Sequence, residues 1–276
     1  MSNNLAAIRG AGLGLRRDII DDLENTTPKN VDFMEIAPEN WIDVGGSIGQ
    51  RLHTFTEKFP FVTHGLSLSL GSPAPLDYVL LEKIKKFLDL HHIAFYTEHL
   101  SYCSDAGHLY DLMPIPFTND AIKYVASRIQ DTQNILERKI AIENVSYYAS
   151  PGQEISELDF LNGILEESGC MLLLDINNVY VNSINHKYDP LHYLEGLPRD
   201  KIAYMHIAGH SQEDTDLIVD THGANVIEPV WNLLKHAYKE FGPIPTLLER
   251  DFNFPPITDL LTEVSTIKKY QAQAQQ

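Results

Sequence analysis

The sequence predicts an α/β fold: a (β/α)8 barrel, also called a TIM barrel, in one domain over residues 1–270, followed by a flexible tail at 271–276. Short apolar runs and helical patterns alternate eight times along the chain, as in such barrels. Several runs are nearly continuous, which is typical of strands buried on both faces of a parallel sheet. No glycine-rich phosphate-binding motif follows an early run, which disfavours the doubly wound open sheet.

Each expected strand is an apolar run bounded by polar or turn residues. In the expected helix at 76–90, apolar residues recur at Tyr78, Leu81, Ile84 and Phe87 with lysines between them. Asn119 and Asp120 resemble the start of another helix. The expected strands are 11–15, 33–36, 61–68, 94–99, 140–143, 171–175, 202–207 and 246–249, and the clearest helices are 76–90, 119–136, 155–167, 230–238 and 258–270.

Composition limits the class of protein. Of the 276 residues, 43% are hydrophobic, which is enough for a large core. The net charge of −17 argues against broad binding to nucleic acid or anionic membranes, but carboxylates can hold cations. Cys103 and Cys170 cannot form a disulfide framework or a CxxC site, and we interpret both as buried small side chains. No signal-like start and no apolar run of about 20 residues is present, so we expect a cytoplasmic protein.

Ionisable side chains end six consecutive strands, the third to the eighth. In a barrel, the carboxyl ends of the strands surround one axis and carry the active site. A single histidine or carboxylate there is usually a hydrogen-bonded core residue, a helix cap or part of an ion pair. Taken together, the histidines and carboxylates form a ligand set for Zn, Fe or Mn. The residues are His64, His99, Glu143, Asp175, His206 and Glu249, and the loop after the seventh strand adds Asp220 and His222.

This order of ligand types, with Asn178 after Asp175, resembles that of the xylose-isomerase-like TIM barrels, which include the trinuclear-zinc endonuclease IV. A closer resemblance covers nearly the whole chain and identifies it as a member of the multinuclear non-heme iron-dependent oxidative enzymes, the family of the methanobactin-biosynthesis oxidase. The segments that carry it are GAGLGLR at 10–16, EIAPENW at 35–41, THGLSLS at 63–69, TEHLSY at 97–102, IENVS at 142–146, LDINN at 174–178 and HIAGH at 206–210.

The resemblance implies two or three iron ions and O2 as cosubstrate, although a recombinant sample could instead contain Zn or Mn. It implies modification of a cysteine-containing, ribosomally made precursor peptide, presented by a small partner protein. Nucleic acid and membranes are not expected as partners. By resemblance, the first metal is held by His64, His99 and Glu143, and Glu143 bridges to the second. The second is held also by Asp175, His206 and Glu249, and the third by Asp220 and His222.

One residue departs from the endonuclease pattern. Asn178 stands where that enzyme has a histidine, and an amide is a poorer ligand for a transition metal. We therefore expect a weaker or partly open third site. Asn144, Asn177 and Arg250 lie beside the ligands in sequence, as does Asn182, and we expect them to orient the ligands or the substrate, the alternative being packing alone.

Three other functions stay open. A zinc phosphodiesterase like endonuclease IV needs the same cluster together with basic residues for DNA, which the charge of −17 disfavours. A sugar isomerase or epimerase needs one or two divalent ions and a base, but no O2. A metal-buffering or peptide-binding module would release its metal to chelators and would turn nothing over.

Overall fold

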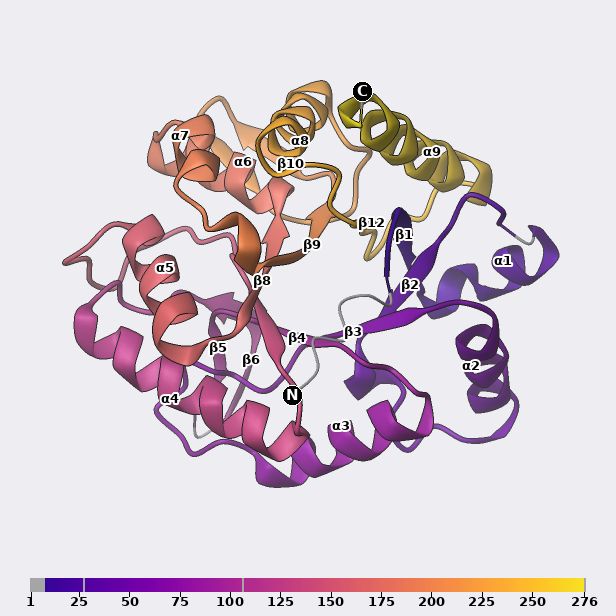
Figure 1. Ribbon diagram of the computed structural model, residues 1–276, viewed down its shortest axis with the longest axis horizontal. Coiled ribbons are helices and arrows are strands. Elements are labelled where there is room, and N and C mark those ends of the chain that lie inside the picture. The colour runs from indigo at the N-terminus through magenta and orange to yellow at the C-terminus, as the bar shows by residue number, and fades with distance from the viewer. Residues whose placement is uncertain (1–7, 27, 106, 276) are drawn as a thin grey trace. The chain divides into compact units, whose positions relative to one another are not determined.

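The computed structural model describes residues 8–26, 28–105 and 107–275. Eight strands form a closed barrel in the order β1-β12-β9-β8-β7-β4-β3-β2, which confirms the predicted fold class (Figure 1). Each expected strand has its counterpart in this barrel. The strands are β1 (Ala11–Gly14), β2 (Phe33–Ile36), β3 (Phe61–Gly65), β4 (Tyr96–His99), β7 (Ile140–Glu143), β8 (Met171–Asp175), β9 (Ile202–Ile207) and β12 (Thr246–Leu248).

The chain divides into two compact units, where sequence analysis expects one domain. Among the described residues, the first unit comprises 36–173 and the second comprises 8–35 and 174–275. Residues 1–7, 27 and 106 of the expected domain, and residue 276 of the expected tail, lie outside the described part of the chain.

In the first unit, strands β3, β4, β7 and the start of β8 pair in parallel. Neighbouring helices in sequence, α3 with α4 and α4 with α5, pack side by side, and Figure 1 shows them outside these strands. Asp77, Thr118 and Ser156 cap three of the helices through their side-chain oxygens. The helices are α2 (Gly46–Lys58), α3 (Tyr78–Leu90), α4 (Asn119–Leu136) and α5 (Glu157–Ser168), and a 3-10 turn spans Pro38–Asn40.

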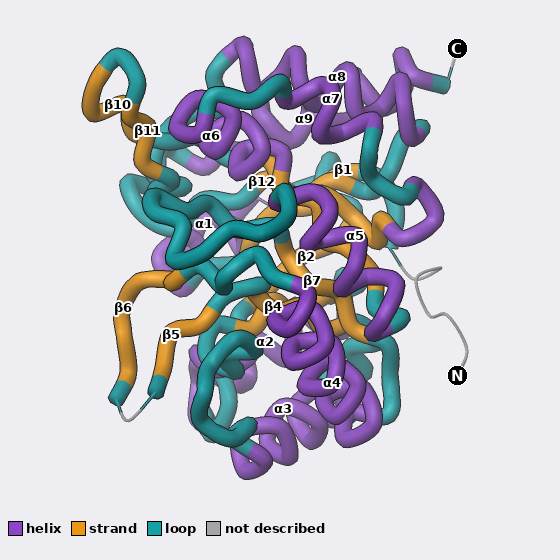
Figure 2. Tube along the Cα trace, turned by 90° about the vertical axis from the view of Figure 1, so that its left-hand side faces the viewer, coloured by secondary structure: helices purple, strands orange, loops and turns teal. Residues whose placement is uncertain are grey.

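A two-stranded ribbon, which sequence analysis does not anticipate, follows β4. It pairs β5 (Tyr102–Ser104) with β6 (His108–Met113) in antiparallel register and extends as a hairpin in Figure 2. Strand β5 has only three residues, and a register shift separates Tyr102 from Ser104. The ribbon therefore lacks the long alternation by which a strand is recognised in sequence.

In the second unit, strands β2, β1, β12 and β9 pair in parallel. Helix α8 packs against α6 and α9, and α9 also packs against β1. A second ribbon joins β10 (Ser211–Asp214) to β11 (Leu217–Val219). The helices are α1 (Ile20–Thr26), α6 (Ile176–His186), α7 (Pro190–Glu195), α8 (Glu228–Phe241) and α9 (Ile257–Ala274), with 3-10 turns at Arg17–Ile19 and Arg199–Lys201.

The expected flexible tail at 271–276 is instead helical as far as Ala274, where α9 ends. Gln271 is buried, and its Nε2 donates to the carbonyl oxygens of Gly10 (2.9 Å) and Ile244 (3.0 Å). These bonds join the last turns of α9 to segments far away in sequence, so local composition does not reveal them. Within the described residues, no helix is long and apolar enough to cross a bilayer.

Candidate metal centre

The first-unit cluster consists of His64, His99 and Glu143, which lie at or next to the carboxyl ends of β3, β4 and β7. Strand register sets their positions, because His99 pairs directly with Glu143 across β4 and β7. The two Nε2 atoms of the histidines are 3.1 Å apart. The Oε2 of Glu143 lies 3.3 Å from the Nε2 of His64 and 3.4 Å from that of His99. The structure thus brings together the three side chains that sequence analysis proposes as ligands of the first metal.

Hydrogen bonds on the far side of each ring define which nitrogen faces the cluster. The Nδ1 of His99 is 2.9 Å from the carbonyl oxygen of Gly65, which can only accept, so Nδ1 carries the proton. The hydroxyl of Thr97 donates to the Thr63 carbonyl and thus accepts from the Nδ1 of His64 at 2.7 Å. When the rings are neutral, both Nε2 lone pairs face the carboxylate oxygen of Glu143.

This arrangement suits a cation. Two nitrogen lone pairs and a carboxylate oxygen at 3.1 to 3.4 Å repel one another unless a proton or a metal ion lies among them. Burial makes that repulsion stronger, since His64 and Glu143 are almost inaccessible to water. Imidazole with carboxylate is the donor set of Zn, Fe and Mn sites, so the residues present fit such an ion.

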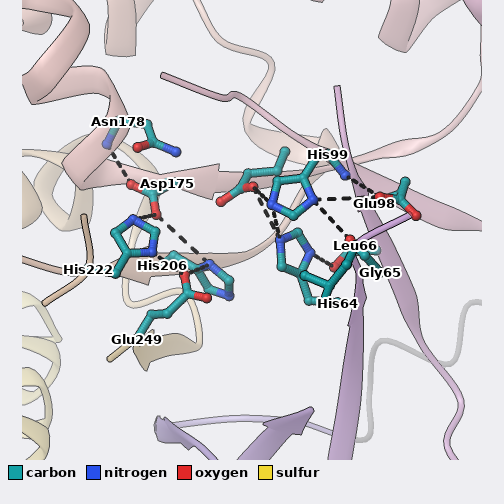
Figure 3. Close-up of polar contacts among 12 residues, drawn as sticks. His64, Gly65, Leu66, Glu98, His99, Asp175, Asn178, His206, His222 and Glu249 are labelled. Carbon is teal, nitrogen blue, oxygen red and sulfur yellow. Dashed lines mark hydrogen bonds and ion pairs between the residues drawn. The ribbon is translucent and has the colours of Figure 1, made fainter. Parts of the chain in front are cut away.

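The second-unit cluster consists of Asp175, His206 and Glu249, whose ligand atoms all lie within 4.8 Å of one another. Asp175 ends β8 and caps α6, where its Oδ1 accepts from the backbone N–H of Asn178 at 2.6 Å. Its Oδ2 is left facing the Nδ1 of His206 at 3.9 Å. That Nδ1 lies 2.9 Å from the Oε2 of Glu249, which directly follows β12 (Figure 3).

His222 and Asp220, which the loop after β11 supplies, lie against this second-unit cluster. The Nε2 of His222 is 2.7 Å from the Oδ1 of Asp220 and 3.9 Å from the Oδ2 of Asp175. Burial disfavours the charged form of His222, but attraction from Asp220 and Glu249 outweighs it and raises the pKa of His222 well above its usual value. The backbone φ of His222 is 48°, in the left-handed region that a non-glycine residue adopts at a cost of about 1–3 kcal/mol. The surrounding loop thus holds this ring in a strained position.

Two further charged residues, Arg16 and Asp251, lie beside the second-unit cluster, and sequence analysis predicts neither. Arg16 Nη2 lies 3.1 Å from the Oε1 of Glu249 and 2.8 Å from the Oδ1 of Asp251. Asp251 also reaches the Nδ1 of His222, at 3.5 Å. Burial raises the pKa of Glu249, but the nearby His206 and His222 outweigh burial and lower it well below its usual value. Arg16 therefore holds one oxygen of Glu249 and leaves the other toward the histidines.

The predicted orienting residues differ in what they contact. Asn177 donates from Nδ2 to the Oδ1 of Asp220 at 2.9 Å, and its Oδ1 lies 2.7 Å from the Nδ1 of His210. Asn178 is buried in the first turn of α6. Asn144 is buried directly after β7.

Arg250, which sequence analysis expects to orient the ligands or the substrate, contacts a loop residue and a residue of α9. Its Nη2 donates to the Oδ1 of Asn225 at 2.9 Å and lies 3.6 Å from the Oε2 of Glu263 on α9. Glu249 and Arg250 are consecutive residues after β12, and their side chains have different partners. Arg250 is thus bonded to Asn225, which lies on the same loop as His222.

Glu35 and Glu98 are further buried carboxylates beside the ligands that sequence analysis assigns no role. Glu98 accepts from the hydroxyl of Tyr96 at 2.6 Å and from the backbone N–H of His99 at 3.1 Å. Glu35 accepts from Tyr204 and His206. Their signal in the sequence is an acidic residue one position before the end of a buried strand.

Comparison with known proteins identifies relatives over nearly the whole chain. The family model described as "RiPP precursor modification enzyme MbnB/TglH/ChrH" matches residues 10–272, where RiPP denotes a ribosomally synthesised and post-translationally modified peptide. A UPF0276 protein of Nitrosospira multiformis is 60% identical over 95% of this chain and 93% of its own length. A UPF0276 protein of Pseudomonas aeruginosa is 50% identical over 96% of this chain and 93% of its own length.

Solved structures with similar folds are xylose-isomerase-like barrels of low sequence identity. The 3-keto-D-glucoside 4-epimerase YcjR of E. coli has a TM-score of 0.63 at 12% identity, covering 95% of this chain and 100% of that one. The IolI protein with a bound zinc atom has a TM-score of 0.59 at 15% identity, covering 96% and 97%. At these identities the likeness establishes the barrel fold alone.

Proposed function

Because the chain belongs to the RiPP precursor modification enzymes of the MbnB/TglH/ChrH family, we propose that it is an O2-using iron oxidase that modifies a precursor peptide at cysteine. Membership of this family implies an enzyme whose substrate is a ribosomally made peptide. The oxidase chemistry, the iron and the cysteine are our proposal. They come from the resemblance carried by the sequence motifs and from the chemistry of the two clusters.

The observation that carries the proposal is the convergence of imidazole and carboxylate groups in each unit. His64 and His99 approach within 3.1 Å through nitrogens that their partners direct toward Glu143. A protein core favours such a contact only when a proton or a metal ion lies among these atoms, because buried acceptors repel one another. A bound iron ion would make the cluster attractive and would supply binding and reduction of O2.

The ligand assignment extends the expectations from the sequence. His64, His99 and Glu143 would hold one ion, and Glu143 would bridge to a second ion held also by Asp175, His206 and Glu249. Asp220 and His222 would hold a third. Asn178 offers only an amide at the position where endonuclease IV has a histidine, so the third ion would be the most labile.

The residues around the ligands have positioning roles. Thr97 and Gly65 hold the rings of His64 and His99 by their Nδ1 atoms. Asn177 holds the carboxylate of Asp220 so that one of its oxygens faces His222. Asn144 and Asn178, being buried beside ligands, would orient them in the same way, whereas Arg250 would steady the loop of His222 through Asn225.

The precursor peptide would reach the site on a small presenting partner protein, in the cytoplasm. We expect neither nucleic acid nor a membrane as a partner, since a net charge of −17 repels phosphate. Both cysteines of this chain, Cys103 and Cys170, are buried, so neither competes with a substrate cysteine at the surface.

The test is a comparison of three reactions on one iron-loaded preparation. A cysteine-bearing candidate peptide with its presenting protein should cause O2 consumption and a mass change, and a Cys→Ser peptide should cause neither. Cleavage of abasic DNA by the zinc-loaded protein without O2 uptake would favour the phosphodiesterase. Anaerobic turnover of a keto sugar would favour an isomerase or epimerase.

A further inference from the structure

Glu35 lies against His206 in the interior of the second unit. It is the third residue of β2 and is only 1% exposed. Its Oε2 accepts from the hydroxyl of Tyr204 at 2.5 Å and from the Nε2 of His206 at 2.9 Å. Tyr204 and His206 are alternate residues of β9, so both side chains point to the same face of that strand. One carboxylate oxygen of β2 thus joins two side chains on the same face of β9, although β1 and β12 lie between these two strands in the barrel.

The hydrogen bond to Glu35 determines the orientation and tautomer of His206. A carboxylate only accepts, so the Nε2 of His206 carries a proton. The other nitrogen, Nδ1, faces Glu249 at 2.9 Å and Asp175 at 3.9 Å. In the neutral ring, this is the nitrogen with the lone pair.

The two units differ in this respect. In the first unit, His64 and His99 present Nε2 and are held through Nδ1 by a hydroxyl and a carbonyl, which are uncharged. In the second unit, His206 presents Nδ1 and is held through Nε2 by a carboxylate. A carboxylate partner increases the basicity of the opposite ring nitrogen and so strengthens its bond to a metal.

We propose that Glu35 is a positioning residue that commits the Nδ1 of His206 to the metal ion of the second unit and strengthens that bond. Tyr204 supports it by fixing the carboxylate from a second direction, which holds the oxygen in place between the two side chains. This inference rests on the metal-binding part of the proposed function and is independent of iron, O2 and the peptide.

The experiment follows the ring nitrogens of His206 by NMR in protein labelled with 15N-histidine, with Zn2+ as the probe. A His206→Gln variant assigns the signals. In the wild-type protein, Zn2+ should shift Nδ1 while Nε2 keeps its proton. The same signals, followed through a titration against a competing chelator, give the zinc dissociation constant of this one site.

Two substitutions of Glu35 distinguish its effect on the tautomer of His206 from the effect of its negative charge on zinc binding. Glu35→Ala should allow both tautomers of His206 and raise the zinc dissociation constant about 10- to 100-fold. Glu35→Gln keeps an acceptor but loses the charge, so the tautomer should persist while zinc binds more weakly than in the wild type. Tyr204→Phe should give the smallest change, because Glu35 keeps its bond to the ring.

The matched control is Glu157→Gln, which alters another tyrosine–glutamate bond, from the hydroxyl of Tyr147 at 3.1 Å, in the first unit. It should leave His206 unchanged. Zinc bound through the Nε2 of His206, or an unchanged tautomer and affinity in folded Glu35→Ala, would overturn the inference. If Glu35→Ala does not fold, undiminished zinc affinity in Glu35→Gln overturns it. Coordination through Nδ1 in a protein that never consumes O2 would refute the oxidase and leave this inference standing.

Discussion

Replacing Gly65 with alanine perturbs the first-unit cluster without touching a ligand. Gly65 follows His64 on β3 and pairs with Glu98 of β4. A Cβ at this position would lie 2.0 Å from the hydroxyl oxygen of Tyr96 and 2.4 Å from the Oε2 of Glu98. Since ordinary contacts begin at about 3.4 Å, the hydroxyl must retreat by about 1.4 Å. That movement breaks its 2.6 Å hydrogen bond to Glu98.

The cost has two parts. Overpacking a buried position costs about 1–3 kcal/mol, and losing a buried hydrogen bond costs about 1–3 kcal/mol. The sum, about 2–6 kcal/mol, corresponds to a Tm lower by about 5–20 °C for a chain of this size. The carbonyl of Gly65 also holds the Nδ1 of His99 at 2.9 Å, so metal bound in the first unit should fall as well.

The assay is thermal unfolding together with metal analysis, and Gly152→Ala is the control. Gly152 has a negative φ, and the nearest atom to its added Cβ is the Cβ of Pro116 at 3.8 Å. It should unfold within about 2 °C of the wild-type protein. A Gly65→Ala protein as stable and as metal-rich as the wild type would refute the account of why a glycine stands beside His64.

Three further predictions concern the ligands and the loop after β3. Glu143→Gln should reduce bound metal by more than one ion per chain, as measured by elemental analysis, and a loss of one ion or none would contradict the bridging role. In metal-free protein, the combined contribution of Glu249 and His222 to stability should be largest between about pH 4.5 and 6.5, the usual pKa values of the two groups. The depressed pKa of Glu249 makes stability fall below that window, and the raised pKa of His222 makes it fall above the window. In the Glu249→Gln variant, the free energy of unfolding should fall less at acidic pH, as measured by urea unfolding at a series of pH values. Arg128→Lys should lower the free energy of unfolding by about 2–4 kcal/mol, because the buried guanidinium donates to three carbonyls between β3 and α3. A change below about 1 kcal/mol would contradict this.

The convergence of the candidate ligands on barrel strands was predictable because two simple patterns coincide. A buried parallel strand is a short apolar run, and a polar residue at its end stands out, as His64, His99 and Glu143 do. Barrel topology then brings residues together that are far apart in sequence. Asp220 and His222 were harder to recognise as candidate ligands, because they lie on a loop and not at the end of a barrel strand. Their close spacing on that loop nevertheless indicated that both could reach one ion.

The supporting contacts were not predictable, because they depend on the reach of individual side chains. Arg16 and Glu249 are 233 residues apart, and nothing local shows that one oxygen of Glu249 is held by a guanidinium. Glu35 is visible as an acidic residue near the end of a strand, yet its partner on β9 follows only from the structure. The bond from Gln271 to Gly10 at the end of α9 likewise follows only from the structure, because the two residues are far apart in sequence.

The central claim is that these histidines and carboxylates hold iron for O2 chemistry. The most direct test measures iron per chain and Mössbauer spectra of anaerobically purified protein before and after O2 is added with a cysteine-bearing peptide. We expect two to three irons per chain and spectra that change only when O2 and peptide are both present. Tightly bound zinc, no activity after iron loading and no O2 uptake would contradict it.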